Sequence, residues 1–101
     1  MLIDIRGDNM KIPKKIKVAG HYYKIEWNDE WLNDNGFVGY SFHNKSLIYL
    51  CKIFRGDKLS ESIIEETLLH EILHAVDVNY NHHALSEETV DRLSEGLYQV
   101  L

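Results

Sequence analysis

The sequence predicts an α+β domain in which an antiparallel sheet of two hairpins packs against two C-terminal helices. Residues 15–53 contain short alternating or β-rich runs separated by turn residues, whereas residues 60–101 contain two long runs with helical periodicity. Strands followed by helices in one short chain are typical of the α+β class. A chain of 101 residues is large enough for one hydrophobic core and too small for two, so residues 1–101 are predicted to form a single domain.

The first hairpin is predicted from Lys15–Val18 and Tyr23–Trp27, because both runs alternate polar and apolar residues. The dipeptide Ala19-Gly20 supplies the turn between them. Residues 1–13 are expected to form a loose arm or a short edge strand that ends at its proline, since proline cannot donate to a β-ladder.

The second hairpin is predicted from Phe37–Phe42 and Leu47–Ile53, two β-rich runs separated by the polar residues 43–46. Between the two hairpins, the polar segment Asn28–Gly36 fits a loop or a short helix. A glycine at the end of such a segment is typical of a helix C-terminus.

The first long helix is predicted over about residues 60–80, with Ser60 as its N-terminal cap and Ser62, followed by Glu65, as a second possible cap. Apolar residues cover most of its circumference, which is typical of a helix buried at the centre of a domain. The loop Asn79–Leu85 follows, and a second helix is predicted over about residues 86–101. The apolar stripe of this second helix consists of Val90, Leu93, Leu97, Val100 and Leu101.

Composition and charge exclude several functional classes. No apolar run approaches the roughly 18 residues that a transmembrane helix requires, and the N-terminus lacks the basic and apolar regions of a secretory signal. A net charge of −5 argues against general nucleic-acid binding. The single cysteine, Cys51, excludes an internal disulfide and suits a reducing compartment, so a cytoplasmic location without membrane attachment is expected.

Residues 70–74 read His-Glu-Ile-Leu-His and lie within the first long helix. Positions i and i+4 share one helix face, so His70 and His74 can present two imidazoles to one metal ion. Glu71 projects from the edge of that face, where it can deprotonate a metal-bound water without being a ligand. Buried polar groups without partners cost about 1–3 kcal/mol each, and one metal ion would satisfy all three residues. The alternative is a pair of hydrogen-bonded core histidines.

A catalytic zinc site usually has three protein ligands and a water molecule, so a third ligand is needed. Glu87 lies on the side of the second helix that borders its apolar stripe, and it is therefore the preferred third ligand. Glu88 lies on the solvated side, where its favourable interaction with the helix dipole explains it fully. The alternatives that remain are two histidines of the connecting loop and the cysteine thiolate: His82, His83 and Cys51.

Two aspartates compete to accept a hydrogen bond from a ligand histidine. Asp91 lies one helical turn beyond Glu87, and Asp77 lies one turn beyond His74. The remaining histidines lie in predicted strands or turns, where surface or core packing is the simpler interpretation: His21 and His43.

The HExxH motif, followed by Glu87-x-x-x-Asp91 on a second helix, resembles the glutamate-zincin branch of the zincin metallopeptidases. The specific part of the resemblance covers residues 62–101, which look like the short metallopeptidases of phages and mobile elements, distant relatives of the ImmA/IrrE type. The resemblance implies a minimal zincin-like domain and hydrolysis of a peptide bond in a protein or peptide substrate. It implies Glu71 as the general base and zinc held by His70, His74 and Glu87.

The resemblance also implies that substrate adds as a strand to an edge of the sheet, for which Leu47–Ile53 is the expected strand. The connection between the motif and the second helix is short for this branch. No clear oxyanion-stabilising motif is present, and only three residues have suitable positions: Tyr80, His82 and His83. The alternative function is a non-catalytic, zinc-stabilised or regulatory binding module on the same scaffold.

Overall fold

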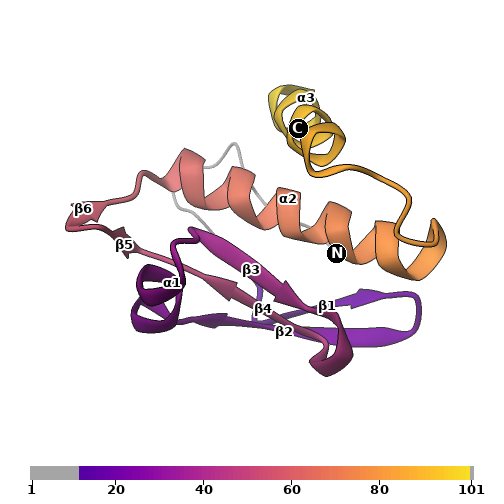
Figure 1. Ribbon diagram of the computed structural model, residues 1–101, viewed down its shortest axis with the longest axis horizontal. Helices are drawn as coiled ribbons and strands as arrows, with labels where there is room; N and C mark the ends of the chain where they lie inside the picture. Colours follow the sequence, from indigo (N-terminus) through magenta and orange to yellow (C-terminus); the bar gives the residue numbers. More distant parts are fainter. Residues whose placement is uncertain (1–11, 101) are drawn as a thin grey trace.

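The computed structural model describes residues 12–100, which form a four-stranded sheet, a two-stranded sheet and three α-helices. Helix α2 (Glu61–Tyr80) lies on one face of the four-stranded sheet, and α3 (Glu87–Val100) packs on the side of α2 that faces away from the sheet (Figure 1). The predicted α+β class is confirmed, and so are the two C-terminal helices. The expectations for residues 1–11 and for Leu101 fall outside the described residues.

The first predicted hairpin is confirmed. β1 (Lys15–Val18) pairs antiparallel with β2 (His21–Trp27), and both turn residues between the strands have positive φ, 52° at Ala19 and 82° at Gly20. Two such residues give a turn whose twist matches that of the strands, and glycine adopts this conformation without steric cost. The alternating pattern then directs one face of each strand into the core beneath α2.

The second predicted hairpin is confirmed in its pairing but not in its length. β3 (Gly39–Phe42) pairs antiparallel with β4 (Leu47–Leu50) through the short 3₁₀ helix η1 (His43–Lys45). The prediction that the second strand continues to Ile53 is wrong. It ends at Leu50, and shortly beyond it the Asp29 carboxylate accepts the backbone N–H groups of Lys52 and Ile53 at 2.8 and 3.1 Å, which takes them out of the sheet.

Beyond this point the chain forms a small ribbon that the sequence did not predict. β5 (Ile53–Phe54) pairs antiparallel with β6 (Asp57–Lys58), and the turn places Arg55 and Gly56 at positive φ. The ribbon leads directly into α2, where the Oγ atom of Ser60 accepts a hydrogen bond from the Ile63 N–H at 3.3 Å, as predicted for an N-terminal cap.

The four-stranded sheet is mixed, so the prediction of an antiparallel sheet is wrong. Its strand order is β1-β2-β4-β3, and β2 pairs parallel with β4. β4 takes the central position because it carries Ile48 and Leu50, which are fully buried, whereas β3 carries Gly39 and Ser41 on the same face. Consequently β3 is an edge strand, as β1 is at the other side of the sheet, and the prediction that Leu47–Ile53 is an edge strand is also wrong.

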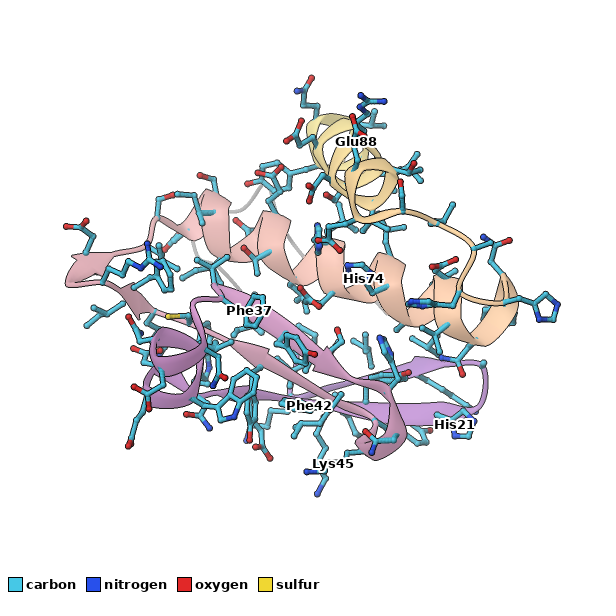
Figure 2. The ribbon with its side chains drawn as sticks, in the orientation of Figure 1. His21, Phe37, Phe42, Lys45, His74 and Glu88 are labelled. Atoms are coloured by element: carbon cyan, nitrogen blue, oxygen red, sulfur yellow. The ribbon has the colours of Figure 1, made fainter. Side chains whose placement is uncertain are left out.

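Helix α1 (Asp29–Asn35) connects β2 to β3 and confirms the short helix predicted at residues 28–36. The Asn28 side chain caps its N-terminus, and Gly36 ends it with a φ of 77°. The helix contributes Trp31 to an aromatic cluster with ring-centroid distances of 5.0–5.6 Å on the face of the sheet away from α2, where Phe42 also lies (Figure 2). The other cluster members are Tyr40 and Tyr49.

Helix α2 is covered on two sides but not all round. Ile64, Leu68 and Ala75 are buried in the core with the sheet residues, whereas 45% of Ile63 and 39% of Val76 remain exposed. The prediction of a central, buried helix is therefore confirmed only for part of its apolar surface. Because α3 covers only one strip of α2, apolar residues beside that strip stay in contact with solvent.

The carboxylate of Asp77 organises the loop that connects α2 to α3. Its Oδ1 atom accepts hydrogen bonds from the Leu85 N–H at 3.1 Å and from the Asn81 side-chain amide at 3.0 Å. Burial disfavours the charged form, but these hydrogen bonds outweigh burial and lower the pKa of the Asp77 carboxyl group. The start of α3 is thereby tied to the end of α2.

Gly39 allows the edge strand to approach α2 closely. A Cβ atom at this position would clash with Cγ2 of Thr67. The Thr67 side chain cannot rotate away freely, because its hydroxyl donates a hydrogen bond to the Ile63 carbonyl at 2.7 Å. We expect Gly39→Ala to lower the free energy of unfolding by about 1–3 kcal/mol, as overpacking does, measured by urea unfolding.

A second substitution provides the control for this prediction. Thr67→Ser removes the clashing methyl group and keeps the hydroxyl, so the double variant Gly39→Ala/Thr67→Ser is expected to recover most of the lost stability. A double variant as unstable as Gly39→Ala alone would contradict the clash as the cause.

None of the helices in residues 12–100 is both long enough and apolar enough to cross a membrane.

Candidate metal centre

Two histidines of α2 and one glutamate of α3 converge where these helices meet. The Nε2 atoms of His70 and His74 lie 2.8 and 2.9 Å from the two carboxylate oxygens of Glu87, and 3.0 Å from each other. One donor atom from each residue lies within 4.8 Å of the others, a spacing at which a single metal ion could contact all three. The structure thus brings together the three residues that the sequence singled out as metal ligands.

The local structure explains this convergence. His70 and His74 are one turn apart on α2, so their rings lie side by side, with centroids 4.7 Å apart. Figure 2 shows His74 on α2 where this helix passes α3. Glu87 belongs to the first turn of α3, and its side chain is 67% exposed, so it closes the group from the solvent side.

Asp91 occupies the position beside His70 that the sequence suggested. Its Oδ1 atom lies 3.1 Å from Nδ1 of His70. A carboxylate at this nitrogen favours the tautomer with the proton on Nδ1, which leaves the lone pair of Nε2 free for a metal ion. Asp77, the competing candidate, has a different role because its carboxylate binds the loop at Leu85.

Glu71 lies beside the three converging residues, but it is not part of the group that could hold a metal ion. Its side chain is buried, and its Oε1 atom accepts a hydrogen bond of 2.6 Å from the Ser41 hydroxyl. Burial raises the pKa of the Glu71 carboxyl group, an effect that the Ser41 hydrogen bond and the nearby His70 and His74 partly offset. A buried carboxylate with a raised pKa is suited to accept a proton.

Ser41 was not identified from the sequence. It lies on the edge strand β3, whose side chains alternate, so that Gly39 and Ser41 face α2 while the residues between and after them face the aromatic cluster. Alternation could have placed Ser41 on a given face, but it could not show that this face lies against Glu71.

Two cavities of about 380 and 390 Å³ adjoin the site. Both are lined by Gly39 of the edge strand and by His70, Glu71 and Glu87. The first extends towards α3 and the second towards η1. Together they form a cleft that follows β3 past the converging histidines.

The other residues that were considered as third ligands lie outside this group. Glu88 forms an ion pair with Arg92 and lies on the outer side of α3, away from α2 (Figure 2). Cys51 is buried near α1, where its thiol donates to the Ile53 carbonyl at 2.9 Å. Burial and the neighbouring Asp29 carboxylate raise the pKa of this thiol, so a thiolate is disfavoured.

The histidines of the loop are exposed and have positive φ values, 54° at His82 and 57° at His83. His83 lines the second cavity and lies 3.9 Å from the Asp77 carboxylate, whereas His82 and Tyr80 line neither cavity. Of the three positional candidates for oxyanion stabilisation, only His83 therefore borders the cleft. His21 lies at the end of the β1–β2 hairpin (Figure 2).

His43 is a second residue of the cleft, besides Ser41, that the sequence did not identify as functional. It was expected to be a packing residue, but it lines the second cavity together with His70, Glu71 and His74. Its Nδ1 atom lies 3.2 Å from the Tyr23 hydroxyl. Burial and the nearby His74 and His83 lower the pKa of His43.

Comparison with protein-family models, with curated proteins and with solved structures finds no match to this chain.

Proposed function

We propose that this protein is a zinc-dependent metallopeptidase that hydrolyses peptide bonds in a protein or peptide substrate. The observation that carries the proposal is the convergence of His70, His74 and Glu87 beside a buried Glu71 that is not itself part of the ligand group. A purely structural site has no use for this fourth residue. The resemblance of the sequence to the zincins favours the same function.

The donor set fits zinc. Two imidazole nitrogens and one carboxylate are common zinc ligands, and Asp91 favours the His70 tautomer that can bind a cation. Other divalent ions accept the same ligands, and zinc is proposed because this set is typical of hydrolases. When bound, zinc supplies a Lewis acid that lowers the pKa of a water molecule and polarises a carbonyl group.

The chain itself supplies the base and its orientation. Ser41 donates to Oε1 of Glu71, which holds the carboxylate in place and leaves Oε2 to accept a proton from the attacking water. The same carboxyl group can then return this proton to the leaving amine. Burial raises the pKa of Glu71, so its carboxylate is a stronger base than an exposed one.

The edge strand offers a place for an extended substrate. Among the described strands β3 pairs only with β4, so the N–H and C=O groups of its other edge can pair with a peptide. The cleft follows this edge past Glu71. We propose that the peptide adds to β3.

We also propose that the protein works in the cytoplasm, where its single buried thiol stays reduced.

Zinc removal tests the proposed function. The protein is loaded with zinc and incubated with a peptide library, and cleavage is followed by mass spectrometry. We expect cleavage that stops after treatment with a chelator and returns when zinc is added. Stoichiometric zinc without cleavage would instead support the non-catalytic binding module.

Replacing Asp91 by alanine should weaken zinc binding without abolishing it. The variant loses the acceptor that orients His70, and partners of this kind typically contribute 10–100-fold in metal affinity. We expect the Kd for zinc to rise by about 10–100-fold in competition with a chromogenic chelator. Glu95→Ala is the control, because it removes the same charge from an exposed position one turn later on α3. Equal weakening in both variants would contradict an orienting role for Asp91.

A further inference from the structure

We propose that His43 donates a hydrogen bond from Nε2 to the carbonyl oxygen of the bound peptide at the bond that is cleaved. This inference rests on the proposed peptidase function and adds a residue that contacts the substrate. His43 belongs to η1, directly after the edge strand β3. It would supply the oxyanion-stabilising donor for which the sequence offered no clear motif.

The position of His43 suits this role. η1 follows β3 without a break, so a peptide that pairs with β3 passes close to η1. His43 lines the same cavity as His70, Glu71 and His74, but it is not part of the group whose donor atoms could share one metal ion. It therefore borders the space beside the three candidate ligands without being one of them.

The hydrogen bonds around Tyr23 determine which nitrogen of His43 carries the proton. The Asn79 amide donates to the Ala75 carbonyl at 2.8 Å, which fixes the orientation of this amide, and it donates its other N–H to the Tyr23 hydroxyl at 3.0 Å. The Tyr23 oxygen thus accepts one hydrogen bond. Its own proton is buried, and among the described residues Nδ1 of His43, at 3.2 Å, is the acceptor within its reach.

A neutral imidazole that accepts at Nδ1 must carry its proton on Nε2. Within residues 12–100, Nε2 of His43 has no hydrogen-bond partner, so this N–H is free to donate to a ligand in the cavity. Burial and the nearby His74 and His83 lower the pKa of His43, which favours the neutral ring. Neutral imidazoles act as carbonyl-polarising donors in enzymes, and a neutral ring does not repel the metal ion.

Nitrogen-15 NMR of the side chain tests the tautomer without any turnover. In the zinc-loaded protein, we expect the signals of His43 to show a proton on Nε2 and none on Nδ1. Tyr23→Phe removes the hydroxyl that donates to Nδ1, so this variant is expected to show a mixture of tautomers. A proton on Nδ1 in the parent protein would overturn the proposal.

Kinetics test the contact with substrate. Removing one donor of this kind typically lowers kcat by about 100–1,000-fold, so we expect a fall of this size for His43→Ala, with a smaller change in KM. His43→Gln keeps an N–H donor and should recover part of the loss, and Tyr23→Phe should fall between His43→Ala and the parent. His21→Ala, which removes an exposed histidine of the β1–β2 hairpin, should be unchanged.

Zinc content and inhibitor affinity separate this proposal from the proposed function. His43→Ala should keep its zinc and remain folded, with a lower Tm because the buried Tyr23 hydroxyl loses its acceptor. It should bind a peptide hydroxamate at least about tenfold more weakly, which corresponds to one lost hydrogen bond. Loss of zinc would instead make His43 a metal ligand and overturn the proposal, as would an unchanged hydroxamate affinity. If the zinc-loaded parent cleaves no peptide, the proposed function fails, while the hydroxamate affinity still decides the role of His43.

Discussion

Glu71→Gln is expected to retain its zinc and to lose nearly all hydrolysis. Glutamine has the same shape and can still accept the hydrogen bond from Ser41, so the fold and the ligands remain in place. It cannot take a proton from water. General-base catalysis contributes about 10²–10⁴-fold, and we expect kcat/KM to fall by that factor while elemental analysis still finds zinc.

The same substitution, which lowers activity, is expected to raise the stability of the zinc-free protein at higher pH. Burial raises the pKa of Glu71 in the folded protein, so the folded state binds the proton more tightly than the unfolded state. The stability that this protonation contributes is fully present below the ordinary glutamate pKa and is lost as the pH rises through the folded value. Glutamine never ionises, so in zinc-free protein Glu71→Gln should gain Tm relative to the parent as the pH rises.

Glu61→Gln serves as the control for both effects, because it makes the same change at an exposed position in the first turn of α2. It should keep full activity and show no pH-dependent gain in Tm. If Glu71→Gln cleaves peptides as fast as the parent, Glu71 is not the base. If its Tm follows that of the parent at every pH, the buried carboxylate does not carry the cost assigned to it.

Helical periodicity was sufficient to predict much of the site. A period of 3.6 residues places His70 and His74 on one face of α2, and it separates Glu87 from Glu88 on α3. It also places Asp91 one turn beyond Glu87, where the structure has it beside His70. These relations depend only on spacing within a helix, so they can be derived from a local stretch of sequence.

The parts that the sequence did not reveal depend on how distant segments pair. Alternation in β3 and β4 predicts a hairpin, but it does not say which of the two strands joins β2. The structure places β4 there, because of the two strands it is β4 that carries completely buried apolar residues, Ile48 and Leu50. Only this arrangement leaves β3 at the edge, and only then do Ser41 and His43 face the cleft.

Glu87→Ala should abolish stoichiometric zinc binding. Glu87 contacts the Nε2 atoms of both histidines and supplies the only carboxylate of the converging group in residues 12–100. A partner outside the ligand set, such as Asp91, is expected to contribute 10–100-fold, so loss of a ligand should weaken zinc binding by more than about 100-fold. Elemental mass spectrometry of the purified variant, together with a competition assay for its Kd, measures this loss.

Glu88→Ala is the matched control, since it removes the same side chain from the next position of α3. This variant loses an exposed ion pair with Arg92, an interaction that contributes about 0.3–0.5 kcal/mol in helices, and it should bind zinc as the parent does. The two variants have equal net charge, so general electrostatic attraction cannot separate them. Equal loss of zinc in both variants would contradict the assignment of Glu87. Loss in Glu87→Ala alone would show that zinc binding needs a carboxylate on the face of α3 that meets His70 and His74.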